Sequence, residues 1–231
     1  MTGMMLRRAG RLGFVLFALA AFGLFMLPWF KGDNGDVIIG LDVGYVESEL
    51  PGTPNPLTQY FLEMTQLPAF VTLFLAFTVA VRRRWARIVA VVVVVLAAAM
   101  TVAAAAVPLT RVEDYWEPAE VRRYQMFALV TVALAVLLLA AAGTLAAGLR
   151  QAYHGFVVAL LLAFTAFHLV NVAILAGPGV GGTMTAAAWL PAPAYLLAAG
   201  CAVLAATGAA AAERSEPAAA PAPVPQPAGR A

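Results

Sequence analysis

Three polar residues, Thr165, His168 and Asn171, recur at helical spacing inside an apolar run near the end of the chain. Residues three positions apart project along one face of a helix, so their side chains form a polar stripe. Polar groups in hydrocarbon seek hydrogen-bond partners, so the stripe either faces another helix or lines a ligand or ion pocket. No second polar stripe is visible to complete a pocket, which favours packing against a neighbouring helix.

The chain's two histidines, His154 and His168, lie fourteen residues apart. On one helix this separation puts both rings on nearly the same side, about 21 Å apart along the axis. Membrane b-type cytochromes use such a spacing, but they need matching ligands on a second helix. We therefore expect no haem and no other cofactor.

The residue types needed by common intramembrane enzymes are missing from the apolar runs. Both serines, Ser48 and Ser215, lie outside them, so a serine protease would lack its nucleophile. The sequence has no HExxH and no P-loop, and its Gly-Asp pairs at 32–33 and 35–36 lie in a loop. The single cysteine, Cys201, excludes an internal disulfide and a CxxC pair. We expect a protein that is not an enzyme.

The first acidic loop offers oxygen ligands for a divalent cation from Asp33, Asn34, Asp36 and Asp42. Calcium and magnesium prefer oxygen ligands, but this spacing fits no defined cation-binding loop. We expect a solvated acidic surface and no metal site.

The elements that must position these residues are long apolar runs. The chain is 63% hydrophobic and 11% charged, whereas soluble domains carry about 25% charged residues. A helix needs about 20 mainly apolar residues to cross a membrane, and six runs meet that length: 12–30, 57–81, 88–107, 124–148, 156–176 and 187–211. The sequence predicts an all-α polytopic membrane protein with six transmembrane helices in three hairpins, occupying residues 1–212.

Charges alternate in sign along the segments between these runs. The segments counted as inside hold ten arginines and two glutamates: Arg7, Arg8, Arg11, Arg82, Arg83, Arg84, Arg87, Arg150, Arg214 and Arg230, with Glu213 and Glu216. The outside segments hold four bases (Lys31, Arg111, Arg122, Arg123) and ten carboxylates: Asp33, Asp36, Asp42, Glu47, Glu49, Glu63, Glu113, Asp114, Glu117 and Glu120. Basic residues resist translocation, so this bias predicts both termini in the cytoplasm.

The first run resembles a signal peptide in its preceding arginines, but it ends in the bulky residues Leu27 to Phe30, and we expect it to remain uncleaved. In the loop 31–56 we expect short strands at 37–39 and 43–46, with the next helix beginning near Thr58. The connection 177–185 is glycine-rich and predicted to be flexible. From Glu213 the Ala/Pro-rich residues 213–231 predict a disordered cytoplasmic tail.

Aromatic residues near the ends of the runs predict interfacial belts. Trp29, Tyr60, Trp116, Tyr124 and Trp189 are expected at the outer boundary, with Trp85 and Tyr153 at the inner one. Small residues predict close helix approach, at Ala140, Gly143 and Ala147 in the fourth run and at Ala198, Gly200 and Ala205 in the sixth. The third run is apolar all round and is expected to face lipid.

The stretch LFMLPWFKGDNG at 24–35 resembles the exit of the first helix in small multi-pass membrane proteins of high-GC actinobacteria, which carry LPWF or LPWY there. The preference for arginine over lysine (thirteen to one) and the Ala/Pro tail are similar to those proteins as well. The resemblance covers the first hairpin alone and implies an origin without an activity.

These observations predict a non-catalytic integral protein of a bacterial plasma membrane. We expect an accessory or scaffold subunit that meets other membrane proteins through its acidic extracytoplasmic loops, and no nucleic-acid partner. The alternative is the membrane subunit of a transporter or exporter that another chain powers. A transport subunit would depend on Thr165, His168 and Asn171, whereas a scaffold would depend on loops 31–56 or 108–123.

Overall fold

The computed structural model describes residues 2–52, 54–80, 84–110 and 118–214. Most of these residues are α-helical, which confirms the predicted all-α class. Among them, five helices are long and apolar enough to cross a membrane: α1 (Thr2–Gly23), α4 (Arg84–Thr110), α5 (Pro118–Ala146), α6 (Arg150–Leu175) and α7 (Pro191–Arg214). The chain is therefore built as a polytopic membrane protein.

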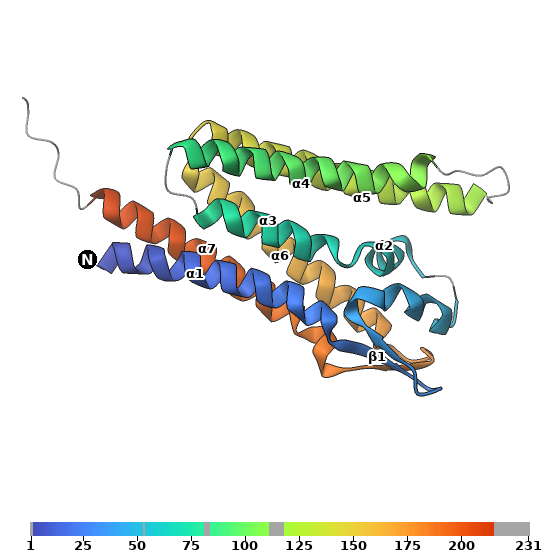
Figure 1. The fold of residues 1–231 in the computed structure, drawn as a ribbon. Helices are drawn as coiled ribbons and strands as arrows, with labels where there is room; N and C mark the ends of the chain where they lie inside the picture. Colours follow the sequence, from blue (N-terminus) through green and yellow to red (C-terminus); the bar gives the residue numbers. More distant parts are fainter. Residues whose placement is uncertain (1, 53, 81–83, 111–117, 215–231) are drawn as a thin grey trace, which may run out of the picture.

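The second apolar run is not one continuous helix, so its prediction as a single span over 57–81 is wrong in this detail. It forms α2 (Pro56–Met64) and the 14-residue α3 (Leu67–Ala80), which are separated at Thr65 and Gln66. Pro68 explains the break, because proline has no amide hydrogen and its ring would clash with the Met64 carbonyl of a continuous helix. α3 still runs along the bundle (Figure 1).

Helices α1 and α7 run side by side and make the most extensive contact between described helices (Figure 1). Gly10 and Gly208 allow this approach, because a Cβ atom on either would lie 2.5 Å from backbone nitrogen of the facing helix, at Ala205 and Arg7 respectively. The prediction of close approach at Gly143 and Gly200 is wrong, since nothing lies within 4 Å of a Cβ placed there.

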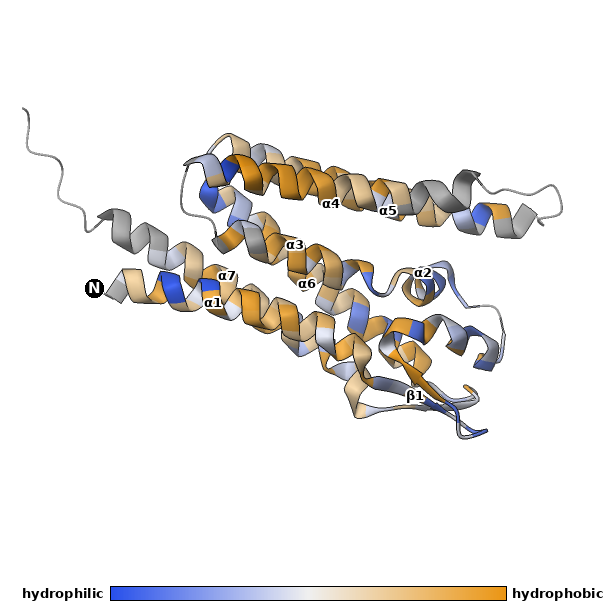
Figure 2. Cartoon of the chain, in the orientation of Figure 1, coloured by the Kyte–Doolittle hydropathy of each residue, from blue (hydrophilic) through white to orange (hydrophobic). Residues whose placement is uncertain are grey.

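The other helices complete a bundle in which α4 and α5 form a hairpin and α3 and α6 lie between this hairpin and α1 with α7 (Figure 1). The helix bodies are apolar and the hydrophilic residues gather towards the ends (Figure 2). On α4, Ile88 and Leu96 are exposed while Val94 and Ala98 are buried, so one face of this helix packs inward and the other is free to meet lipid.

One end of the bundle carries a small folded cap, which we define as the described residues of 28–64 together with 182–189. Its antiparallel sheet has the order β2-β1-β3, with β1 at Pro28–Gly32, β2 at Val37–Ile39 and β3 at Gly182–Met184. The 3-10 helices η2 (Gly40–Glu49) and η3 (Ala186–Trp189) and helix α2 complete it.

The cap confirms the strand predicted at 37–39 and corrects three neighbouring predictions. Residues 43–46 belong to η2 rather than to a strand. The first span does not reach residue 30, because α1 ends at Gly23, the 3-10 helix η1 (Leu24–Met26) follows, and Pro28 begins β1. The connection predicted to be flexible contributes β3, which pairs with β1.

Several aromatic residues expected at the membrane boundaries are instead part of the core. Trp29, Tyr60 and Tyr153 are almost fully buried, because β1, α2 and α6 each turn the ring towards other elements. Trp85 and Trp189 are 63% and 37% exposed, as interfacial residues should be. Residues 81–83, 111–117 and 215–231, which include Trp116, part of the predicted loop 108–123 and most of the predicted tail, lie outside the described residues.

Candidate functional site

The predicted stripe on α6 is buried, and His168 is its centre. His168 is 3% exposed, and its Nε2 donates a hydrogen bond of 2.7 Å to the carbonyl of Ala188 in η3. Since Ala188 is itself fully buried, this bond connects the membrane bundle to the interior of the cap.

Four aromatic rings from four different elements surround the imidazole. The ring centroids of Trp29 and Phe61 lie 5.3 and 5.5 Å from that of His168, and those of Tyr195 and Phe25 lie at 6.4 and 6.5 Å. All four approach edge-on, the arrangement that aromatic quadrupoles favour. The histidine is therefore enclosed by β1, α2, α7 and η1.

Trp29 is the cap residue that joins this cluster most closely. The burial pattern along β1 places Trp29 and Phe30 inside, and the Trp29 indole Nε1 donates to the Leu24 carbonyl at 2.9 Å. Gly40 lies directly against the indole face, where a Cβ atom would collide with the ring. The second hydrophobic core of the molecule gathers around this tryptophan and includes Phe25, Phe61 and Val172.

The other two stripe residues form hydrogen bonds within their own helix. Thr165 Oγ1 donates to the Leu161 carbonyl at 2.8 Å, and Asn171 Nδ2 donates to the Phe167 carbonyl at 2.7 Å. Asn171 Oδ1 and Tyr195 Oη are buried and have no hydrogen-bond partner among the described residues. The structure thus buries all three stripe residues on one face of α6, where each bonds to a backbone carbonyl and not to another stripe residue.

The arrangement does not present His168 as a metal or haem ligand. Its Nε2 is engaged by the Ala188 carbonyl, and His154, at the opposite end of α6, donates from Nδ1 to the Arg150 carbonyl at 2.7 Å. Within the described part of the chain, no three side chains of His, Cys, Asp or Glu lie close enough together to hold a metal ion.

Acidic residues of the loop 31–56 surround a hollow on the cap. This cavity of about 380 Å³ is mainly polar and is lined by Asp36, Asp42 and Glu49, together with Tyr45 and Ser48. Asp36 and Asp42 are exposed, and Tyr45 is 73% exposed. The hollow therefore faces the surroundings of the protein, and its carboxylates are accessible to a partner.

Local hydrogen bonds shape the turn that carries these acids. Asn34 Oδ1 accepts from the Asp36 amide at 2.9 Å, and its Nδ2 donates to the Asp36 carboxylate at 2.7 Å. This is an Asx turn, in which the side chain replaces a backbone hydrogen bond. The four residues considered as cation ligands, Asp33, Asn34, Asp36 and Asp42, thus include two that bind each other.

Two glutamines add polar contacts inside the cap and between the cap and the bundle. Gln59, which is fully buried, donates from Nε2 to Glu47 Oε1 at 2.7 Å within the cap. Gln66, just beyond the cap, donates from Nε2 to the Leu41 carbonyl at 2.8 Å and so ties the cap to the bundle. Both bonds join η2 to the α2–α3 segment. The sequence analysis placed Trp29 at the membrane boundary and did not single out Phe61, Tyr195 or these two glutamines, because no local pattern shows which distant residues a side chain meets.

Comparison with protein-family models, curated proteins and solved structures gives no match to this chain. The resemblance of residues 24–35 to actinobacterial membrane proteins therefore stays a prediction. The function has to be argued from the geometry of the cap and of the stripe below it.

Proposed function

We propose that this chain is a non-catalytic membrane protein, an accessory or scaffold subunit that binds partner proteins through its acidic cap. The observation that carries the proposal is the joining of two loops far apart in sequence. β1 pairs with β3 from Phe30 opposite Met184 to Gly32 opposite Gly182, and Thr185 Oγ1 donates to the Pro28 carbonyl at 2.5 Å. Connections that merely link helices need no such pairing.

The buried stripe supports this proposal because it holds the cap against α6. The His168–Ala188 bond and the rings of Trp29 and Phe61 hold cap elements against α6. A surface that is already ordered binds a partner at a lower entropic cost than a mobile loop does. On this account the polar stripe has a structural purpose, and the cap makes the contacts.

The charge of the cap indicates the kind of partner. Residues 31–49 carry one base, Lys31, and five carboxylates, those of Asp33, Asp36, Asp42, Glu47 and Glu49. Complementary charge mainly raises association rate and specificity, and salt weakens it. The partner we propose is a protein that presents a basic surface on the extracytoplasmic side.

The orientation that this requires is six spans with both termini in the cytoplasm of a bacterial cell. Within the second run, α3 is the proposed sixth crossing, and the arginines at the end opposite the cap support the assignment of that end as cytoplasmic. In a Cys201→Ala background, Tyr45→Cys should react with a membrane-impermeant maleimide in intact cells, and Arg8→Cys should react after lysis alone. The reverse pattern would overturn the orientation.

The alternative function, the membrane subunit of a transporter or exporter powered by another chain, makes different demands. It requires an associated ATPase, and it requires Thr165, His168 and Asn171 to be available to a substrate. The enclosure of His168 by four rings favours the scaffold proposal over this one.

Affinity purification from native membranes with quantitative mass spectrometry tests the proposal. The variant Asp36→Asn/Asp42→Asn/Glu49→Gln should lose at least fivefold of one recurrent partner, and salt should release the same partner from wild type. The matched control Arg8→Gln/Arg87→Gln/Arg150→Gln neutralises three charges at the other end and should retain it. If both variants retain the partner, or if the associated protein is an ATPase that needs the stripe, the proposal fails.

A further inference from the structure

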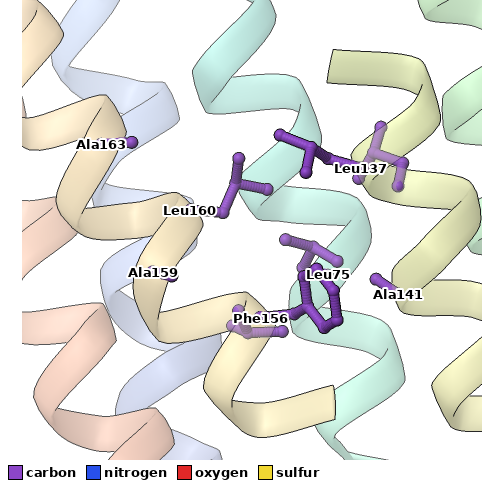
Figure 3. Close-up of a pocket in the computed structure, with 9 residues that line it drawn as sticks. Leu75, Leu137, Ala141, Phe156, Ala159, Leu160 and Ala163 are labelled. Carbon is purple, nitrogen blue, oxygen red and sulfur yellow. The ribbon is translucent and has the colours of Figure 1, made fainter. Parts of the chain in front are cut away.

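An apolar groove runs between helices α3, α5 and α6, on the side of the bundle away from α1 and α7. Two hollows form it, of about 190 Å³ and 310 Å³, and both are lined by Leu137, Leu160 and Ala163. In the first hollow Leu75, Phe156 and Leu160 point towards α5 across the gap (Figure 3). Leu137 is 46% exposed, so the groove opens to the exterior of the bundle, where the bilayer would lie.

The depth of the first hollow matches the hydrocarbon of one leaflet. Its lining residues on α6 begin at Phe156 and end at Ala163, which at 1.5 Å per residue is about 9 to 20 Å along the helix from Arg150. One leaflet contributes about 15 Å of the roughly 30 Å hydrocarbon core. An acyl chain whose head group sits beside Arg150 would therefore reach along this hollow.

Positive charge lies near the end of the groove that Phe156 lines, at the start of α6. α5 and α6 are joined there by a tight turn, in which the Leu149 amide donates to the Thr144 carbonyl at 2.9 Å. Arg150 begins α6 and is exposed, and a Cβ atom on Gly148 would lie 3.3 Å from the Arg87 guanidinium. The two arginines thus flank one turn, and the exposed Trp85 lies on the same turn of α4 as Arg87.

We propose that this groove is a binding site for an anionic phospholipid of the cytoplasmic leaflet. One acyl chain lies between Leu75, Ala141 and Phe156, and Arg87 and Arg150 bind the phosphate. The proposal rests on the orientation given above only for the name of the leaflet, and it is independent of any partner at the cap.

Size and charge together select this occupant. A transmembrane helix is about 10–12 Å across with its side chains and is too thick for hollows of these volumes. A neutral lipid could fill the groove but would gain nothing from the arginines. Each basic residue near the membrane surface favours an anionic lipid by about fivefold, so two of them should discriminate clearly.

Native mass spectrometry of the delipidated protein tests the site, with phosphatidylglycerol and phosphatidylcholine of identical chains added together. Wild type should retain phosphatidylglycerol at least fivefold better. Arg87→Gln/Arg150→Gln should bring the ratio close to one, and Ala159→Trp, which fills the groove, should reduce retention of both lipids. Two controls should leave both readouts unchanged: Arg8→Gln, which removes an exposed positive charge from α1, and Leu162→Trp, which enlarges an exposed side chain of α6 outside the groove.

Equal retention of the two lipids by wild type would overturn the proposal, as would a preference that survives Arg87→Gln/Arg150→Gln. If a variant does not fold, the thermal stability of wild type decides instead. Phosphatidylglycerol should then raise the melting temperature more than phosphatidylcholine does, and equal shifts would mean that these lipids form only a general shell. The cap variant Asp36→Asn/Asp42→Asn/Glu49→Gln should keep the wild-type lipid preference even where it loses the cap partner. Failure of one proposal can therefore be told apart from failure of the other.

Discussion

The connection between the bundle and the cap can be tested by replacing His168. In His168→Phe the ring contacts with Trp29 and Phe61 are kept, while the buried Ala188 carbonyl loses its donor. A buried polar group left unpaired costs about 1–3 kcal/mol. In His168→Ala the ring is lost as well, and a cavity remains among four aromatic side chains. By comparison with truncations of other large core residues, the free energy of unfolding should fall by about 3–5 kcal/mol in total.

Two measurements follow this perturbation. Thermal unfolding in detergent should show the order wild type, then His168→Phe, then His168→Ala, with roughly 2–4 °C lost per kcal/mol. Hydrogen–deuterium exchange should localise the effect. Relative to wild type, the exchange rate should increase more in β3 and η3 than in α4 and α5.

The second histidine provides the control. His154 bonds a carbonyl of its own helix at the far end of α6, so His154→Phe should leave cap exchange unchanged. Equal stability of His168→Phe and wild type, or faster exchange spread evenly over the bundle, would refute the reasoning that this histidine secures the cap.

Four further substitutions test the packing. Gly208→Ala should lower the free energy of unfolding by about 1–3 kcal/mol, because its methyl group overpacks α7 against α1. Gly200→Ala meets open space and should leave the free energy of unfolding unchanged or raise it by about 0.5–1 kcal/mol. Unfolding in detergent measures both. Gly40→Ala should cost a similar 1–3 kcal/mol because its methyl group meets the Trp29 ring, and tryptophan fluorescence should report the displacement. Asn171→Leu should change the free energy of unfolding by less than about 1 kcal/mol, because it removes an unpaired carbonyl and a bond within its own helix. A loss above 3 kcal/mol would show that Asn171 has a partner that this account lacks.

The helices could be predicted from the sequence because their signal is local. Each apolar run is long enough to define a helix, and the error over 57–81 came from Pro68, whose effect on a transmembrane helix depends on its neighbours. Close helix approach was harder to predict. Gly10 and Gly208 face backbone and Gly200 does not, although nothing in the neighbouring sequence distinguishes them.

The cap and the surroundings of His168 could not be predicted, because both depend on contacts between distant residues. Phe30 pairs with Met184 and Trp29 meets His168, in each case across more than 130 positions. A tryptophan that follows the first span can lie at a membrane interface or in a core, so the residue type alone does not show which of the two positions Trp29 takes. The stripe, in contrast, was visible in advance, since spacing along one helix is a local property.

The central claim is that partners bind at the cap and not at the opposite end of the bundle. A photo-crosslinking amino acid at Tyr45, which is 73% exposed on the cap, compared with one at Trp85, which is 63% exposed at the far end, tests it most directly in living cells. The account predicts one recurrent protein crosslinked from position 45, lost in Asp36→Asn/Asp42→Asn/Glu49→Gln and not obtained from position 85. An ATPase crosslinked from position 85, with nothing captured from position 45, would contradict it.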